Sequence, residues 1–266
     1  MGDSTAILVC AEPSQRFHNS GKAGFNGWMS DESVANRIAG IDWAAIYASL
    51  RERGYATLPP ILTAAECAGL IGLYEHRERF RNRIDMTRFR YGVGEYKYFS
   101  YPLLPLVEDL RMKLYPRVAP IANEWMEALQ IEQTYPATSA EFLARCHEAG
   151  QTRPTPLMLR YEAGGYNCLH QDLYGAIVFP FQFAFMLSKP DTDFDGGEFL
   201  LVEQRPRAQS RGEAIRMAQG GAILFATQYR PVAGVRGFYR ANVRHGVSTI
   251  RRGSRFTLGI IFHDAA

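Results

Sequence analysis

The sequence predicts an α+β protein in which helices precede a β-rich half that folds as a sandwich or jelly roll. Helix caps and helical periodicity occur between residues 41 and 150, whereas short β-rich segments run from Pro156 to the C-terminus. Glycine pairs separate several of these segments, and short strands at such spacing are typical of a sandwich or jelly roll. The pairs are Gly164-Gly165, Gly196-Gly197 and Gly220-Gly221.

The N-terminal part begins without periodicity. Residues 1–40 are rich in Gly, Ser and Asn, so we expect an irregular N-terminal arm. Asp42 is placed to cap a helix over residues 43–53, and residues 55–58 form a short β-rich segment. The sequence therefore predicts a helix followed by one strand directly after the arm.

A capping box marks the next helix. Thr63 is followed three residues later by Glu66, so the helix is expected to begin there and to extend to about Arg79. Further helices are expected over 106–129, interrupted near Pro116 and Pro120, and over 139–149.

The C-terminal part reads as a series of strands. These observations divide the chain into the arm, a mainly helical region over 41–150 with a basic-aromatic loop at 77–100, and a β-domain over 151–266. The expected strands cover residues 157–161, 177–187, 198–202, 222–226, 239–248 and 255–262.

The composition is that of an ordinary globular chain, with 47% hydrophobic and 21% charged residues among 266. No apolar run reaches the roughly 20 residues of a membrane helix, so an integral membrane protein is excluded. The N-terminus has no basic lead before its short apolar stretch, so no secretory signal is expected. Four widely spaced cysteines exclude a zinc ribbon and a dense disulfide scaffold, and they predict a cytoplasmic location.

Positive charge is unevenly distributed. The segment 205–255 holds eleven arginines against one acid, Glu213, and the segment 77–100 carries seven basic residues against three acids. Such asymmetry is typical of a surface that faces nucleic acid, a carboxylate substrate or an acidic partner. The alternative is an arginine-rich composition spread over a solvated surface.

The segment 77–100 is the best candidate for a substrate-contacting element, because it interleaves arginines with aromatic residues. Arginine neutralises phosphates, and aromatic rings stack on an unpaired or flipped base. The same composition suits an acidic peptide, and the first part also fits a solvated helix end. Its candidate substrate residues are Arg88, Arg90, Tyr91, Tyr96 and Tyr98.

Two histidines and one aspartate form the strongest motif. His170 and Asp172 are two residues apart at the end of a strand, so both side chains project to the same face. His245 follows 75 residues later within another strand pattern. Two imidazoles and one carboxylate leave three coordination positions open, which is the arrangement of non-haem Fe(II) oxygenases. The alternatives are two core histidines with a capping Asp, or an inert zinc site that includes Cys168.

Arg255 follows His245 by ten residues. On its strand, Arg255 and Thr257 point to the opposite face from the apolar residues Phe256 and Leu258. A guanidinium there can hold a carboxylate through two parallel hydrogen bonds, which suits the distal carboxylate of 2-oxoglutarate. The alternative is a structural salt bridge.

This ordered set resembles the Fe(II)/2-oxoglutarate dioxygenases over about residues 156–264. The stretches LRYEAGGYNCLHQD and RHGVSTIRRGSRFTLGIIFHD are closest to the AlkB-like and prolyl-4-hydroxylase-like branches. With GGEFLLVEQRPR, they are similar to a bacterial oxygenase family described as acting on damaged DNA. The resemblance implies a double-stranded β-helix (jelly roll, cupin-like) core, Fe(II), and the co-substrates 2-oxoglutarate and O₂. It also implies that Tyr161, nine residues before the metal His, contacts 2-oxoglutarate.

Two positions depart from the AlkB-like pattern. Tyr174 stands where an acid reads the methylated base, and Ile261 stands where a second Arg is usual. The resemblance thus implies hydroxylation of an anionic substrate, either by oxidative demethylation of nucleic-acid bases or by prolyl, amino-acid or peptide hydroxylation. Asp172 disfavours a halogenase. The non-enzyme alternatives are a metal-containing binding module for nucleic acid or peptide and a metal-free cupin-like domain. Tyr174 is a further candidate substrate residue, and His263 is expected at the surface.

Overall fold

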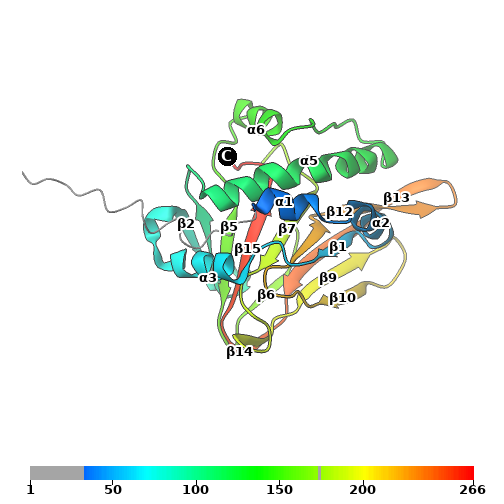
Figure 1. Ribbon diagram of the computed structural model, residues 1–266. Coiled ribbons are helices and arrows are strands. Elements are labelled where there is room, and N and C mark those ends of the chain that lie inside the picture. Colours follow the sequence, from blue (N-terminus) through cyan, green and yellow to red (C-terminus); the bar gives the residue numbers. More distant parts are fainter. Residues whose placement is uncertain (1–32, 173–174) are drawn as a thin grey trace, which may run out of the picture.

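Two antiparallel β-sheets face each other at the centre of the fold (Figure 1). The structure is a computed structural model that describes residues 33–172 and 175–266. Its strands are β1 (Tyr55–Leu58), β2 (Phe80–Asp85), β3 (Gly92–Val93), β4 (Glu95–Phe99), β5 (Leu157–Tyr161), β6 (Tyr166–His170), β7 (Phe181–Met186), β8 (Phe194–Gly196), β9 (Phe199–Gln204), β10 (Arg211–Ile215), β11 (Ala222–Ala226), β12 (Tyr229–Gly234), β13 (Gly237–Val247), β14 (Ile250–Gly253) and β15 (Arg255–Ile261).

The larger sheet has seven strands in the order β1-β11-β7-β15-β5-β4-β2. The smaller sheet has the order β10-β9-β13-β6-β3, with β12 paired to β13, and β8 and β14 form a separate pair. From β5 onward the chain alternates between the two sheets, with β5, β7, β11 and β15 in one and β6, β9 and β13 in the other. This alternation is that of a double-stranded β-helix, so the predicted jelly-roll core is confirmed.

The N-terminal region contributes strands to the larger sheet, which differs from the predicted separation of helices and strands. β1 pairs with β11 at one edge, and β4 pairs with β5 and β2 at the other. The segment 77–100, expected as a loop, therefore contains regular structure. Its alternating burial explains this, because Tyr96 and Tyr98 lie on one face while Glu95 and Lys97 are buried on the other.

The helices follow their capping signals. The Thr63 hydroxyl accepts a hydrogen bond from the Glu66 amide and the Glu66 carboxylate accepts one from the Thr63 amide, as the capping box predicts. This helix ends at Gly72, and two short 3₁₀ turns replace its expected continuation to Arg79. The helical elements are α1 (Val34–Ala39), α2 (Trp43–Arg53), α3 (Ala64–Gly72), η1 (Leu73–Glu75), η2 (Arg77–Arg79), α4 (Met86–Phe89), α5 (Pro105–Ala128) and α6 (Ser139–Glu148).

The expected irregular arm ends earlier than residue 40, because α1 occupies residues 34–39 and is capped by the Ser33 side chain. Residues 1–32 of that predicted arm lie outside the described residues.

Helix α5 is continuous, although an interruption was expected near Pro116 and Pro120. Both prolines are exposed, and the opposite face of the helix is buried along its length. A proline in a helix interior costs about 3 kcal/mol, and the burial of this apolar face outweighs that cost. Trp125 of α5 packs on Phe181 with ring centroids 4.5 Å apart, so α5 covers the larger sheet on the side away from the smaller one (Figure 1).

The residues that follow β15 pack into the core. His263 is fully buried, so its predicted surface position is wrong, and its Nδ1 accepts a hydrogen bond from the Phe179 amide. The adjacent Asp264 pairs with Arg111 of α5 at 2.7 Å, and both side chains are almost completely buried. This ion pair ties α5 to the strand that carries Arg255. Within the described residues, no helix is long and apolar enough to cross a membrane.

Candidate metal and co-substrate site

A cavity of about 410 Å³ opens between the two sheets. It collects side chains from the inner faces of β4, β5, β7 and β15 on one side and of β6, β9 and β13 on the other. The inner residues of β15 are Arg255, Thr257, Gly259 and Ile261, which confirms the predicted alternation of that strand.

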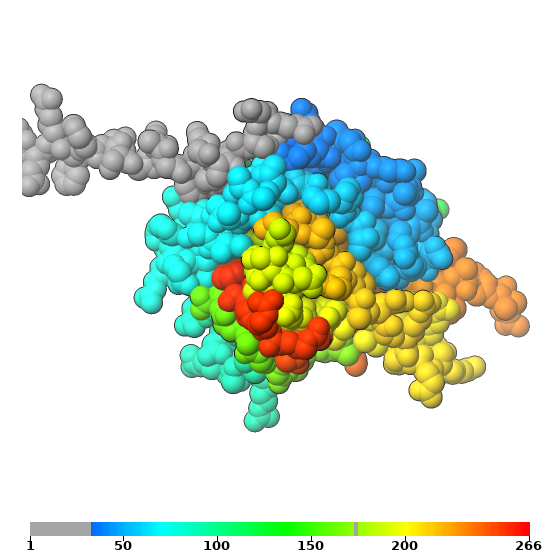
Figure 2. Space-filling view, turned by 60° about the horizontal axis from the view of Figure 1, so that its bottom comes forward, coloured from blue at the N-terminus to red at the C-terminus, as the bar shows by residue number. Residues whose placement is uncertain are grey.

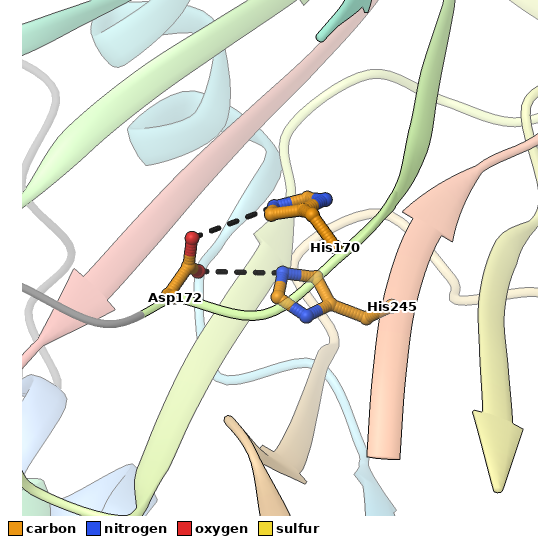
Figure 3. A group of neighbouring side chains, drawn as sticks. All are labelled: His170, Asp172 and His245. Carbon is orange, nitrogen blue, oxygen red and sulfur yellow. Dashed lines mark ion pairs between the residues drawn. The ribbon is translucent and has the colours of Figure 1, made fainter. Parts of the chain in front are cut away.

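His170, Asp172 and His245 meet in this cavity (Figure 3). His170 and His245 are directly opposite each other on β6 and β13, and Asp172 lies just beyond the end of β6. The two carboxylate oxygens of Asp172 lie 3.4 Å from His170 Nε2 and 3.3 Å from His245 Nε2. One donor atom from each residue falls within 4.8 Å of the others, so the three side chains can bind one ion.

The surroundings prepare these groups for a cation. His170 Nδ1 lies 2.8 Å from the Cys168 carbonyl oxygen, so an Nδ1–H donor leaves Nε2 free as a ligand. Burial lowers the pKa of His245, although the Asp172 carboxylate partly opposes that effect. Burial would raise the pKa of Asp172, but hydrogen bonds and charge from both histidines hold that pKa well below its usual value. Asp172 is therefore a carboxylate and His245 a neutral imidazole at neutral pH, the forms that bind a metal ion.

The donor set fits Fe(II). Two imidazoles and one carboxylate form the facial arrangement that suits this ion, and all three side chains line the cavity. Among the described residues no cysteine joins this group, which removes the alternative of a zinc site that includes Cys168. Phe199 stacks on the His245 ring at an interplanar angle of 10°, so the imidazole is held in place by packing.

Arg255 lies opposite Tyr161 where β15 pairs with β5. The Arg255 side chain is 1% exposed, and its guanidinium carbon lies 5.7 Å from the centre of the Tyr161 ring. Within residues 33–172 and 175–266, no carboxylate lies at ion-pair distance from this guanidinium. The predicted alternative of a structural salt bridge is therefore not found there.

Burial lowers the pKa of Arg255 to about 10, so the side chain stays charged at neutral pH. An unpaired buried charge is costly, and such a group is expected where a ligand of opposite charge binds. Tyr161 is fully buried and its hydroxyl has no hydrogen-bond partner in the described part of the chain. Both groups line the cavity.

Beyond Arg255, the residues on the inner face of the larger sheet follow one another along β15 and its neighbouring strands. Thr257 lies between Leu159 and Met186, and Leu159 in turn faces Tyr96 on β4. Ile261, at the far end of β15, pairs with Gln182 of β7. Six residues along a strand span about 20 Å, so the two ends of the cavity are well separated.

The structure brings most of the predicted substrate residues to the cavity. Arg90, Tyr91, Tyr96 and Tyr98 all line it. Arg88 is exposed on α4 and is not part of the lining. Tyr174, also predicted to contact substrate, lies outside the described residues.

Sequence reasoning missed Gln182. Its side chain is 5% exposed, lines the cavity and has an amide nitrogen without a hydrogen-bond partner among the described residues. The signal was present, because Gln182 is the single polar residue in the apolar run from Ile177 to Leu187. A lone polar side chain in a buried strand needs a hydrogen-bond partner, and this requirement marks Gln182 as a candidate ligand contact.

Comparison with known proteins shows the family to which the chain belongs. Residues 94–265 match the model of a family described as "Oxygenase, catalysing oxidative methylation of damaged DNA". The chain is 51% identical over 182 residues to MT2286 and Rv2227, two uncharacterised proteins of Mycobacterium tuberculosis strains CDC 1551 / Oshkosh and H37Rv. The match covers 66% of this chain and 78% of each relative.

Among solved structures, the chain is similar to a prolyl-4-hydroxylase of Pseudomonas putida, with a TM-score of 0.50 and 13% identity. The similarity covers 84% of this chain and 99% of that one, and it concerns the fold.

The chain is therefore an oxygenase, which is an oxidoreductase, and the donor set of His170, Asp172 and His245 suits Fe(II). Within that class, the chain belongs to the oxygenase family whose model spans residues 94–265.

Proposed function

We propose that this oxygenase removes N-alkyl groups from nucleic-acid bases by oxidation. The observation that carries the proposal is an aromatic and basic wall at the cavity. Tyr91 and Phe89 are each about half exposed and stack on each other with centroids 5.6 Å apart, and Arg90 between them in sequence lines the cavity. Exposed aromatic rings beside an arginine suit a stacked base and its phosphate. The family description, which refers to damaged DNA, supports this substrate class.

The co-substrate end of the cavity is assigned as follows. His170, Asp172 and His245 hold Fe(II), and the Arg255 guanidinium binds the distal carboxylate of 2-oxoglutarate with two hydrogen bonds. The Tyr161 hydroxyl, buried beside Arg255, donates to the same co-substrate. Thr257 lies one row further along β15, where its hydroxyl faces the same ligand.

The substrate end lies beyond Thr257. Tyr96 and Tyr98 form its side wall, with ring centroids 5.5 Å apart in an edge-to-face arrangement. Gln182 supplies an amide nitrogen that can donate a hydrogen bond to the edge of a base.

Bound Fe(II) supplies O₂ activation coupled to decarboxylation of 2-oxoglutarate to succinate and CO₂. One oxygen atom of O₂ enters succinate and the other becomes the hydroxyl group of the substrate. Hydroxylation of an N-methyl group gives N–CH₂OH, which breaks down to N–H and formaldehyde. The chain orients the methyl group toward the open side of the triad, and the apolar rings of Phe199 and Phe225 exclude water beside His245.

Product analysis tests the proposal. The protein is incubated with Fe(II), 2-oxoglutarate, ascorbate and a single-stranded oligonucleotide that contains one N-methylated base, and succinate and formaldehyde are measured together. We expect both products in equal amounts. The same assay is repeated with proline-containing peptides or free amino acids in place of DNA. Succinate formation without formaldehyde in that assay would instead identify a prolyl or amino-acid hydroxylase.

Two variants control this experiment. His170→Ala removes one imidazole of the triad and should abolish substrate-dependent succinate formation. His76→Ala changes an exposed histidine outside the cavity and should leave turnover unchanged. Retained turnover in His170→Ala would place the metal elsewhere.

A further inference from the structure

A two-stranded ribbon projects from the smaller sheet. β12 and β13 pair up to Gly234 and Gly237, and Val235 and Arg236 form the turn between them. Figure 1 shows this hairpin extending beyond the rest of the fold, and Figure 2 shows it as a separate projection at one edge of the molecule. Val235 is completely exposed and Phe238 is 55% exposed. Folding gains nothing from exposed apolar side chains at this tip, so the ribbon is a candidate interaction surface.

The ribbon carries positive charge that the protein does not neutralise. Arg236, Arg240 and Arg244 are exposed on the ribbon, and Arg207 is exposed on the adjoining β9–β10 turn. Within the described ranges, none of the four forms an ion pair with an acidic side chain. The Arg240 guanidinium lies 5.0 Å from the centre of the Tyr229 ring on the paired strand, and this contact favours its position on the ribbon.

The nearby acidic groups are already paired. Glu203 binds both Arg205 and Arg230, and Glu213 binds Arg211 at 2.7 Å. The surplus charge is therefore available to an external anion rather than to the protein itself.

We propose that this ribbon binds double-stranded DNA beside the base that the cavity receives. A two-stranded β-ribbon fits the major groove, arginines along its strands reach phosphates, and an apolar tip packs against sugars or bases. The choice of DNA as the partner rests on the proposed function. The ribbon combines separated arginines with an apolar tip, which favours binding in a DNA groove. Binding of an acidic peptide would require only the positive charge.

The ribbon and the site share one strand. Arg236 precedes His245 by nine residues, which corresponds to about 30 Å along β13. This length equals about nine base pairs at 3.4 Å per step. DNA that reaches Arg236 at the tip of the ribbon must therefore extend about one helical turn from the base in the cavity, which a five-nucleotide strand with that base at its centre cannot do.

DNA binding by the full chain tests the inference without turnover. Fluorescence anisotropy is measured with a 24-base-pair duplex that contains one N-methylated base and with a five-nucleotide single strand that contains the same base. The test variant is Arg236→Gln with Arg240→Gln. The matched control is Lys113→Gln with Arg117→Gln, which removes the same charge from exposed positions on α5.

We expect the ribbon variant to lose affinity for the duplex and to keep its affinity for the five-nucleotide strand. Each phosphate contact is worth about eightfold in affinity at 0.1 M salt, so two contacts correspond to a loss of about 60-fold. The slope of log K against log salt should fall by about 1.8. Phe238→Ser should lower duplex affinity while leaving this slope unchanged, because it removes an apolar contact.

Equal loss in the α5 control, or no loss in the ribbon variant, would overturn the inference. Equally tight binding of a poly-glutamate peptide would also overturn it and identify an acidic peptide as the partner. Formaldehyde release from the five-nucleotide strand separates the two proposals. If formaldehyde is released and the ribbon variant binds the duplex as tightly as the parent protein, the proposed function holds and the ribbon inference is wrong. If the ribbon variant loses duplex affinity but no formaldehyde is released, the ribbon inference holds and the proposed demethylation is wrong.

Discussion

Replacement of Arg255 by methionine separates ligand binding from stability, because this guanidinium is buried without an acidic partner in the described residues. Methionine has a similar volume and no charge, so Arg255→Met removes an unpaired buried cation. The free energy of unfolding of the ligand-free protein should stay the same or increase. Binding of 2-oxoglutarate should weaken strongly, because its distal carboxylate then enters the cavity without a partner.

The size of the binding effect follows from the burial of the pair. Truncating one partner of a buried, hydrogen-bonded charge pair costs about 2–5 kcal/mol. At about 1.4 kcal/mol per tenfold change, the dissociation constant of 2-oxoglutarate should rise by between about 30-fold and a few thousand-fold. Arg255→Lys keeps the charge but loses the two-pronged geometry, so its loss should be smaller.

Thermal unfolding under nitrogen, with Fe(II) and with or without 2-oxoglutarate, measures both quantities. A ligand at 100 times its dissociation constant adds about 2.7 kcal/mol of stability, and a chain of this size gains roughly 2–4 °C per kcal/mol. The parent protein should therefore show a rise in Tm of about 5–10 °C with 2-oxoglutarate, and Arg255→Met should show a rise of about 3 °C or less at the same ligand concentration.

Arg111→Met is the matched control. Arg111 is as buried as Arg255, but it pairs with Asp264 at 2.7 Å. Breaking such a pair leaves a buried carboxylate and should cost about 3–5 kcal/mol, while the response to 2-oxoglutarate should remain. A fall in Tm for ligand-free Arg255→Met comparable with that of Arg111→Met would refute the reasoning, since it would reveal a structural ion pair at Arg255.

Three further predictions concern other buried groups. Burial lowers the pKa of His263 to about 4, so below pH 6.5 the unfolded chain binds more protons than the folded chain. The free energy of unfolding therefore has the full contribution of this group above pH 6.5. That contribution falls by up to about 1.4 kcal/mol per pH unit as the pH drops toward 4. Denaturant unfolding of His263→Asn, which keeps an acceptor for the Phe179 amide, should lack that slope between pH 6.5 and 5. Gln182→Leu should raise the KM for the alkylated oligonucleotide by about 5- to 150-fold, from a lost hydrogen bond of about 1–3 kcal/mol, and leave the KM for 2-oxoglutarate unchanged; equal changes in both would contradict its place at the substrate end. Removal of metal with a chelator should lower the Tm of the parent protein but not of His245→Ala, and equal responses would argue against the triad as the metal site.

The elements that sequence could predict are those whose signals are local. The strand around Leu258 was found because apolar residues alternate along it, and the same alternation placed Arg255 and Thr257 on the cavity side. The capping box at Thr63 fixed the start of α3 for the same reason. His170 and Asp172 came together because residues two apart share one face of a strand.

The remaining features depend on partners far away in sequence. The interleaved arginines and aromatic residues of 77–100 predict a loop, yet in β4 Lys97 donates to the Tyr74 carbonyl and Glu95 pairs with Arg83. The position of His263 near the C-terminus predicts exposure, but the pairing of its neighbour Asp264 with Arg111 holds this segment in the core. Local sequence patterns do not predict pairing between residues so far apart in the chain.

Anaerobic titration calorimetry tests the central claim most directly. 2-Oxoglutarate is titrated into the parent protein with and without Fe(II), and into His170→Ala and Arg255→Met with Fe(II). The account predicts one site per chain, tight only when Fe(II) is present, lost with the metal in His170→Ala and weakened at least 30-fold in Arg255→Met. Binding that is equally tight in all four samples, or no binding to the Fe(II)-loaded parent protein, would contradict a site built from the His-Asp-His triad and Arg255.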